Sequence, residues 1–341
     1  MKHDNDMPWY PEDELLEHTP YDTEAPIHSF RALKEAVEAG EVPRPDVIPL
    51  LTLNSEGEIR SPIIKGWLHL YTGAPKVGKT ELLFQAILNW VDERRTLWLS
   101  EEGLSVWVEK THRTPWSIVK GDFHFAYARD KNADWMLHTI EAMDDNGGID
   151  VVVVDTIKLL GIEEENNPAQ ISRAFQPFAN LCAKRGITVI LVHHNRKAGG
   201  RFGDEVSGSN SFTGSVDVII SIRRHSDNDD DTRRICEVHG RADNMRFVYV
   251  LDKETGEMRI AGELDSYNML GLKKRIEDVI TVDPLTASQL RDIIVLDGKG
   301  EVSKSSVGKL LFSMATDGEI VRLPDISEGK IPRQTPRWAK L

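Results

Sequence analysis

From about residue 61 onward, the chain alternates short apolar runs with longer segments whose apolar residues recur at helical spacing. The apolar runs are continuous and rich in β-branched residues, which is typical of strands buried on both faces of a parallel sheet. Such strands are predicted at 67–72, 96–100, 123–126, 151–155, 188–192 and 216–223. Helices are predicted between them at 80–94, 106–111, 135–143 and 172–185. Three later runs, 234–239, 247–251 and 258–260, are expected to form an antiparallel edge, which completes an α/β domain.

Residues 272–341 have a different pattern. Three helices followed by a strand–loop–strand unit is the layout of a winged helix-turn-helix, whose recognition helix contacts DNA near its start. The expected elements are helices at 273–281, 286–290 and 303–317, a strand at 319–323 and a basic tail rich in Pro and Gly. Lys304 and Lys309 in the third helix are therefore DNA-binding candidates, but winged helices also serve as protein-interaction modules. A basic wing is expected from Arg322, Lys330, Arg333 and Arg337.

The first 60 residues precede this alternation. Residues 1–26 are rich in Pro, Asp and Glu with little periodicity, which predicts a mobile acidic arm that docks onto other proteins. A short helix is expected at 30–39, ending at Gly40, and nearby prolines then impose an extended connector. The predicted organisation is an N-terminal arm, helix and connector at 1–60, an α/β domain at 61–268 and a winged-helix-like domain at 269–341.

Composition limits the class of protein. The net charge of −13 argues against a chain that coats nucleic acid with its whole surface, but the charge is uneven. Residues 1–60 hold 5 Lys or Arg against 14 Asp or Glu, whereas residues 271–341 hold 12 against 10, so a local basic site is expected there. The sequence has no run of about 18 apolar residues, no secretory signal and only two cysteines. These features predict a cytoplasmic protein with no membrane segment.

Residues 73–80 read G-x-x-x-x-G-K-T, the phosphate-binding P-loop pattern, between a predicted strand and a predicted helix. In that context backbone N–H groups and the helix N-terminus face the phosphates. We expect Lys79 to reach the β- and γ-phosphates of ATP and the Thr80 hydroxyl to ligate Mg²⁺. The alternative is a Gly/Pro turn that merely starts a helix, which needs neither of these two side chains. The expected nucleotide-binding residues are Gly73, Ala74, Pro75, Lys76, Val77, Gly78, Lys79, Thr80 and Glu81.

Acidic residues end two of the predicted strands. Asp155 closes a run of four valines, and a carboxylate at that edge of a P-loop sheet supports Mg²⁺ in the Walker B role. The alternative for Asp155 is a strand-end residue that caps the next segment. Glu101 and Glu102 follow the strand at 96–100, where a carboxylate can orient and deprotonate the attacking water. The two glutamates compete for that role, and the other is expected to be a surface acid.

His193 and His194 follow the strand at 188–192 at the same expected edge of the sheet. A donor there can sense the γ-phosphate, and we assign this role to His194 and a structural role to His193. The next residues, 195–203, form a glycine-rich basic loop that is expected to contact the phosphates of a nucleic-acid strand. The alternative is a plain connector. The expected DNA contacts in this loop are Arg196, Lys197 and Arg201.

Taken in order, these features resemble the RecA-like AAA ATPases of the RepA-type hexameric replicative helicase group. They are the P-loop, Glu102, Asp155, the sequence His-His-Asn-Arg-Lys at 193–197, and the segment 208–222. The resemblance covers about residues 60–265 and implies a RecA-like P-loop core that binds ATP and Mg²⁺. In that family the glutamate after the second strand is catalytic, which matches Glu102, with Trp98 in the place of a tyrosine. The winged-helix-like region is not part of the resemblance.

The resemblance also implies an arginine finger, a late basic residue that reaches the nucleotide of the neighbouring subunit. Arg241 stands in that place. His239 replaces the lysine of the commoner Lys-x-Arg arrangement, and Arg246 is a second candidate for the finger. The alternative for Arg241 is an ordinary arginine at the end of a surface strand.

The expected function is therefore a Mg²⁺- and ATP-dependent motor that acts on DNA, mainly single-stranded, as a homo-oligomeric hexamer ring in the manner of a replicative helicase. Replication or recombination proteins are the expected partners of the acidic arm. Two alternatives stay open: a recombination or single-strand-annealing ATPase of the same fold, and an ATP-gated DNA-binding regulator or loader. The expected catalytic residues are Lys79, Glu102, Asp155, His194 and Arg241.

Overall fold

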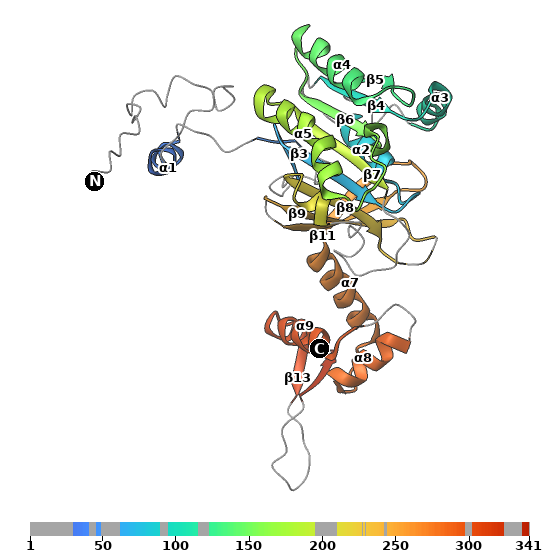
Figure 1. The fold of residues 1–341 in the computed structure, drawn as a ribbon. Helices are drawn as coiled ribbons and strands as arrows, with labels where there is room; N and C mark the ends of the chain where they lie inside the picture. Colours follow the sequence, from blue (N-terminus) through green and yellow to red (C-terminus); the bar gives the residue numbers. More distant parts are fainter. Residues whose placement is uncertain are drawn as a thin grey trace, which may run out of the picture. The chain divides into compact units, whose positions relative to one another are not determined.

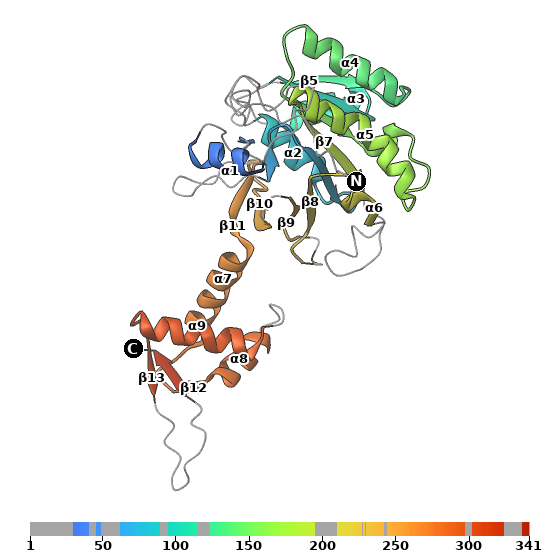
Figure 2. The ribbon, with the colours of Figure 1, turned by 60° about the vertical axis from the view of Figure 1, so that its left-hand side comes forward.

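The chain divides into two compact units, Met1–Ala261 and Gly262–Leu341, each of which is described by itself (Figures 1 and 2). The computed structural model describes residues 30–40, 46–48, 62–88, 95–114, 123–194, 210–226, 228, 230–241, 244–296, 302–323 and 336–340. The expected acidic arm at 1–26 and the prolines of the connector lie outside these residues. The predicted helix at 30–39 is confirmed as α1 (Phe30–Glu38), and β1 (Val47–Ile48) pairs antiparallel with β2 (Ile63–Ile64).

Nine strands of the described residues form the main sheet, in the spatial order β11-β10-β9-β8-β3-β7-β6-β4-β5. The strands from β8 to β5 run parallel, whereas β9 is antiparallel to both β8 and β10. The predicted parallel sheet with an antiparallel edge is therefore confirmed. The strands are β3 (Leu68–Gly73), β4 (Thr96–Ser100), β5 (His124–Tyr127), β6 (Val151–Asp155), β7 (Thr188–His194), β8 (Val218–Arg224), β9 (Arg233–Gly240), β10 (Met245–Leu251) and β11 (Met258–Glu263).

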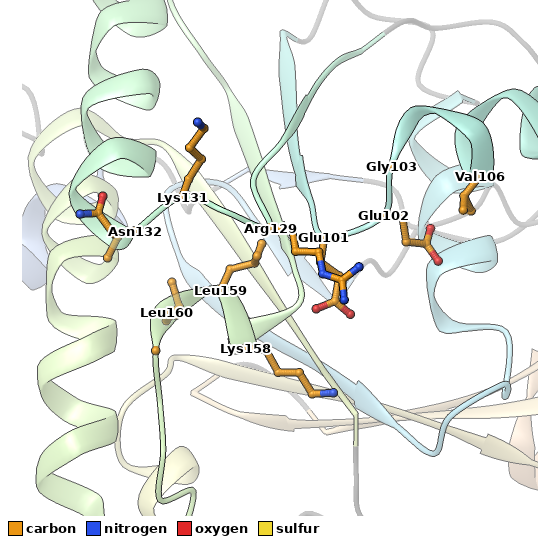
Figure 3. Close-up of a pocket in the computed structure, with 12 residues that line it drawn as sticks. Glu101, Glu102, Gly103, Val106, Arg129, Lys131, Asn132, Lys158, Leu159 and Leu160 are labelled. Atoms are coloured by element: carbon orange, nitrogen blue, oxygen red, sulfur yellow. The ribbon is translucent and has the colours of Figure 1, made fainter.

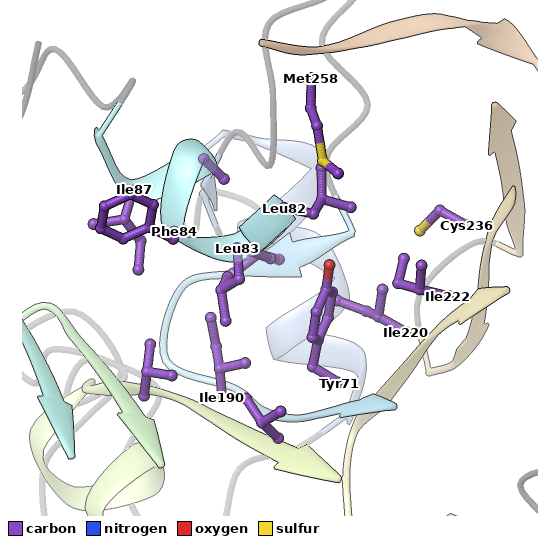
Figure 4. Close-up of a cluster of buried hydrophobic side chains, with 14 of the residues drawn as sticks. Tyr71, Leu82, Leu83, Phe84, Ile87, Ile190, Ile220, Ile222, Cys236 and Met258 are labelled. Carbon is purple, nitrogen blue, oxygen red and sulfur yellow. The ribbon is translucent and has the colours of Figure 1, made fainter. Parts of the chain in front are cut away.

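Helices cover both faces of this sheet. Successive residues of β6 point to opposite sides, so Val151 and Val153 join one buried cluster while Val152 and Val154 join another. The first cluster includes side chains of α2 (Lys79–Leu88) and α3 (Leu104–Arg113), and Figure 4 shows part of it around Tyr71. The second includes side chains of α4 (Ala133–Asp145) and α5 (Pro168–Arg185). A strand covered on both faces must be apolar throughout, which explains the run of four valines.

Local signals determine where these helices begin and end. Asn132 caps α4 by accepting a hydrogen bond from the Trp135 N–H (2.9 Å), and Asn167 caps α5, whose first residue is proline. Gly186 ends α5 in the left-handed conformation. Two short helices, the 3₁₀-helix η3 (Ile157–Leu160) and α6 (Asn210–Thr213), were not predicted, because a single turn shows no period. Across the part of the chain that the structure describes, none of the helices has the length and apolar character needed to cross a membrane.

The second unit has the element order helix–strand–helix–helix–strand–strand, which is that of a winged helix. Its three strands form a small antiparallel sheet in the order β12-β14-β13, and its helices pack on a buried core that includes Ile276, Leu290, Leu311 and Trp338. The elements are α7 (Leu264–Val279), β12 (Leu285–Thr286), α8 (Ala287–Leu296), α9 (Lys304–Thr316), β13 (Ile320–Leu323) and β14 (Arg337–Lys340).

Helix α7 differs from its prediction, which was a helix at 273–281. It begins at Leu264 because the chain continues helically through Gly271, a residue that normally weakens a helix and interrupts the apolar pattern. The expected domain boundary after residue 268 consequently falls inside α7, which lies wholly within the second unit. The predicted wing residues Lys330 and Arg333 lie outside the described residues.

Candidate active site

The P-loop joins β3 to α2 through a tightly turned backbone. Gly73 closes β3, and a Cβ on Gly73 would lie 2.2 Å from the Ile222 carbonyl oxygen, so only glycine permits this close approach of β8. Lys76 (φ 63°) and Gly78 (φ 95°) have the left-handed backbone conformation from which anion-binding nests are built. The residues from Ala74 to Gly78 form the turn, and Lys79, Thr80 and Glu81 form the first turn of α2.

The Lys79 ammonium group connects this loop to the end of β7. Its Nζ donates to the carbonyl oxygens of Gly73 (2.7 Å) and Ala74 (2.9 Å) and lies 2.9 Å from His194 Nδ1. Burial lowers the pKa of Lys79 to about 8, and the charge of Asp155 opposes this shift. Burial and the adjacent Lys79 charge lower the pKa of His194 to about 4. His194 is therefore neutral at pH 7, and its Nδ1 accepts a hydrogen bond from Lys79.

Strand register brings the other candidate groups to the same edge of the sheet. Gly73 lies level with His194 on β7, and Asp155 at the end of β6 lies level with Ser100 at the end of β4. The carboxyl ends of parallel strands meet at one edge, which is where ligands bind in open α/β sheets. The P-loop, Asp155, the two glutamates after β4 and His194 therefore come together from four strands.

Asp155 is buried and hydrogen-bonded to the Thr80 hydroxyl. Burial, together with the negative charges of Glu102 and Glu101, raises its pKa to about 6, while Lys110 and Thr80 oppose this shift. Mg²⁺ prefers oxygen ligands and is usually held by one or two carboxylates together with substrate phosphates. A hydroxyl and a carboxylate side by side, next to a phosphate loop and among further acids, fit that requirement.

The two glutamates after β4 are held differently. Glu102 forms an ion pair with Lys110 of α3, and its negative charge contributes to the raised pKa of Asp155 and opposes the lowering of the pKa of His194. Glu101 instead accepts a hydrogen bond (3.3 Å) from the hydroxyl of the threonine that follows Asp155. Glu102 therefore interacts electrostatically with both Asp155 and His194, which favours Glu102 over Glu101 for activating water. Its catalytic role stays a prediction.

His193 and His194 have separate environments because successive residues of β7 point to opposite faces of the sheet. His193 Nδ1 lies 3.2 Å from Thr72 Oγ1, and its ring packs against Phe212 with 5.0 Å between ring centroids. Its Nε2 lies 3.6 Å from a carboxylate oxygen of Glu165. His193 thus ties β7 to β3 and to the segment before α5, while His194 faces Lys79.

Arg241 lies at the opposite edge of the sheet from the P-loop. It follows β9, whose last residue pairs with Val218 at the start of β8, whereas Gly73 pairs with Ile222 near the end of β8. These two positions on β8 are about 13 Å apart along the strand. The Arg241 side chain is 73 % exposed and forms an ion pair with Asp217 (2.8 Å). Within one copy of the chain, Arg241 therefore does not reach the nucleotide site.

Two residues that the sequence did not single out support the P-loop from the antiparallel part of the sheet. Arg234 of β9 donates from Nε to the Val77 carbonyl oxygen (2.8 Å). Gln85 of α2 bonds to the Gly256 carbonyl and to the Met258 N–H, both at 2.8 Å, in the β10–β11 connection. These contacts join residues 157, 171 and 173 positions apart, so no local pattern reveals them.

The expected DNA-binding residues are divided between the described and undescribed parts of the chain. Arg196, Lys197 and Arg201 lie outside the described residues. Lys304 and Lys309 are exposed on α9, which begins after the N-cap Ser303 in the second unit.

Comparison with known proteins gives similarities to this part of the chain. A family model described as an AAA domain matches residues 43–200, a stretch that includes the P-loop, and an AAA domain implies ATP binding. No curated protein matches the chain. One similar solved structure is a DnaB-like replicative helicase, described with its interactions with primase. It is 14 % identical to this chain, with a TM-score of 0.50. The match covers 67 % of this chain and 65 % of the helicase chain, which is slightly under two thirds of the helicase chain. The ATPase domain of G40P is 14 % identical with a TM-score of 0.48, over 57 % of this chain and 85 % of that one. The predicted RecA-like α/β fold is confirmed.

The raised pKa of Asp155 leads to a prediction for Asp155→Asn. The folded chain binds the proton of the Asp155 carboxyl more tightly than the unfolded chain does. The free energy of unfolding therefore falls as pH rises from about 4 to about 6. At neutral pH the ionised carboxylate costs about 3 kcal/mol of stability. We expect Asp155→Asn to raise the free energy of unfolding by about 2–3 kcal/mol at neutral pH, with no gain below about pH 4. ATP hydrolysis should fall by about 100-fold or more, because a metal ligand is lost. Urea unfolding and ATPase assays measure the two effects.

Asp150→Asn is the matched control, since Asp150 precedes the first residue of β6 and is partly exposed. It should leave ATP hydrolysis intact and should not stabilise the fold. An Asp155→Asn protein that is less stable than the wild type, or that hydrolyses ATP normally, would contradict the assignment of Asp155.

Proposed function

We propose that the chain is a Mg²⁺-dependent ATP hydrolase of RecA fold that works as an oligomeric motor on DNA, in the manner of a replicative helicase. The observation that carries the proposal is the position of the Lys79 ammonium group, between two P-loop carbonyls and the neutral His194. A phosphate loop alone serves many nucleotide-binding proteins. Here the buried Lys79 also contacts His194 at the end of β7. A change at the γ-phosphate can therefore be transmitted from the P-loop to a second strand of the sheet.

The residues divide the hydrolysis step between them. Lys79 and the P-loop N–H groups would hold the triphosphate, and Thr80 and Asp155 would hold Mg²⁺, which would supply polarisation of the phosphate oxygens. Glu102 accepts a proton from the attacking water, whose oxygen forms a new bond to the γ-phosphorus. The bond from the γ-phosphorus to the β–γ bridging oxygen breaks, and its electron pair leaves with ADP. His194 loses its γ-phosphate contact as inorganic phosphate departs.

The position of Arg241 supports a site shared between subunits. An arginine that is 73 % exposed at the far edge of the sheet is accessible to a second copy of the chain. When the P-loop edge of one subunit meets the opposite edge of the next, the contact is heterologous, and repetition of such a contact gives a ring if the rotation between subunits closes. We therefore propose a homo-oligomer, a hexamer ring, in which Arg241 completes the neighbouring nucleotide site.

Basic segments support DNA as the substrate of the motor. The glycine-rich loop at 195–203 follows His194 directly in the sequence, and its basic residues are Arg196, Lys197 and Arg201. We propose that this loop moves along a single strand. The acidic arm at 1–26 is proposed to bind replication or recombination proteins.

One observation favours a second candidate function. The winged-helix order of the second unit, with Lys304 and Lys309 exposed on α9, suits an ATP-gated regulator or loader that binds a specific DNA site or partner. In that case hydrolysis would switch assembly and would not drive movement along a strand.

A mixing experiment tests the shared site. Lys79→Ala should abolish turnover, and Arg241→Ala should lower it by about 10³-fold or more, since each variant lacks one half of every site. Equal mixtures should regain about a quarter of the wild-type rate, because that share of interfaces pairs an intact Lys79 with an intact Arg241. ATP turnover after co-assembly of the two variants is the measurement.

Arg259→Ala is the control, because Arg259 on β11 forms a similar exposed ion pair with Asp252 (2.7 Å). It should keep normal turnover. Full activity of Arg241→Ala, or no recovery on mixing, would rule out Arg241 as the group supplied in trans.

A forked DNA duplex separates the candidate functions. The wild-type chain should release the displaced strand only with ATP and Mg²⁺, and Lys79→Ala should release none. Hydrolysis that is stimulated by single strands without strand release would instead support a recombination or annealing ATPase. Slow hydrolysis that does not respond to single strands would support the regulator or loader.

A further inference from the structure

A pocket of about 800 Å³ opens beyond the two glutamates, at the same edge of the sheet as the nucleotide site (Figure 3). Three segments line it: the residues after β4, the connection from β5 to the start of α4, and η3 with the glycine that follows it. The P-loop residues do not line it. It is therefore a second compartment that shares the candidate catalytic glutamates as one wall.

The facing wall of this pocket is cationic. Arg129 and Lys131 enter it from the β5–α4 connection, and Lys158 enters it from η3. Lys131 lies 3.5 Å from Asp130, whereas the side chains of Arg129 and Lys158 make no hydrogen bond or ion pair with any other residue that the structure describes. In Figure 3 the Arg129 guanidinium points toward the region of the Glu101 carboxylate, and the Lys158 side chain extends from η3 below it in the view. Two cationic side chains, Arg129 and Lys158, thus line the same pocket from different elements, and neither has a partner among the described residues.

Two further features add to the positive potential of this wall. The first turn of α4, with its cap Asn132 and Ala133, lines the pocket, and a helix N-terminus favours anions. On the acidic side, Glu102 is already paired with Lys110. The pocket therefore has more positive than negative charge, although the chain as a whole has a net charge of −13.

The pocket is also coupled to the nucleotide site. Lys158 lies three residues after Asp155, on the helical turn that directly follows β6. Its charge helps to lower the pKa of His194, so its field extends to the candidate γ-phosphate sensor. An anion that neutralised Lys158 would change the electrostatic environment of His194.

We propose that this pocket is a second oxyanion site that takes a phosphate group. The proposal rests on the proposed ATPase motor, and two sources supply such a group: the backbone of a single DNA strand and the inorganic phosphate released by hydrolysis. Arg129 donates two parallel N–H groups to phosphate oxygens, and Lys158 acts as a point charge. The volume exceeds that of one phosphate, and Val106, Leu159 and Leu160 give the pocket apolar surface, which favours a strand as the source.

The test compares the double variant Arg129→Gln/Lys158→Gln with the control Arg173→Gln/Lys184→Gln, which removes the same charges from exposed positions of α5. The first probe is a labelled oligothymidylate, whose affinity for the full chain is measured by fluorescence anisotropy over a range of salt concentrations. The second is inorganic phosphate, whose binding is followed by ³¹P line broadening in a Lys79→Ala background, so that the P-loop does not contribute.

If the site takes strand phosphates, the double variant binds the oligothymidylate about tenfold more weakly than the control. Its slope of log affinity against log salt should be smaller by about 1.4, since each lost contact to a single strand accounts for about 0.7. If the site takes released phosphate, oligothymidylate binding is unchanged and phosphate binding weakens about tenfold. The charge-conserving variant Arg129→Lys/Lys158→Arg should bind the relevant probe more tightly than the double Gln variant in either case, because both positive charges remain.

The proposal is overturned if the double variant and the control bind both probes within about twofold of each other. Neither probe requires turnover, so failure of this site is distinguishable from failure of the proposed function, which would be seen as absence of ATP hydrolysis by the wild-type chain.

Discussion

The Lys79 ammonium group is the interaction on which the candidate site depends. A buried charge is tolerated only where partners compensate for lost hydration, and Lys79 has three: two carbonyl oxygens of the P-loop and the Nδ1 of His194. These contacts connect β3, α2 and β7 through a single atom. The arrangement requires a neutral His194, which burial and the lysine charge maintain by lowering its pKa to about 4. It also explains why the close approach at Gly73 matters, since the carbonyl that Lys79 contacts belongs to that residue.

The rest of the first unit supports this arrangement at some cost in stability. The antiparallel extension braces the P-loop through Arg234 and the helix α2 through Gln85. Asp155 remains ionised at neutral pH despite burial near two glutamates, which raises its pKa to about 6. An acidic cluster of this kind reduces stability, as is common where function opposes stability. Because neighbouring residues of β7 point to opposite faces, His193 packs against the core while His194 contacts Lys79.

Local sequence predicted most of the fold and the centre of the site. Continuous β-branched runs fixed the parallel strands, and the spacing of Gly78, Lys79 and Thr80 located the phosphate loop within a strand–loop–helix unit. The start of α7 was missed because Gly271 interrupts the helical pattern. The support by Arg234 was missed because it joins residues 157 positions apart and depends on how β9 packs against the loop. The cationic pocket was missed for the same reason, since Arg129 and Lys158 meet only through the order of β5, β4 and β6 in the sheet.

In the proposed assembly, half of each catalytic site lies on a neighbouring subunit, and the dependence of activity on assembly tests this most directly. The measurement is the rate of ATP hydrolysis per subunit over a range of protein concentrations, with the oligomeric state determined in the same samples. We predict that the rate per subunit rises with the fraction of oligomer and that monomers are slower by about 10³-fold or more, as expected when a finger supplied in trans is absent. Monomers that hydrolyse ATP at the full rate would contradict a catalytic site shared between subunits.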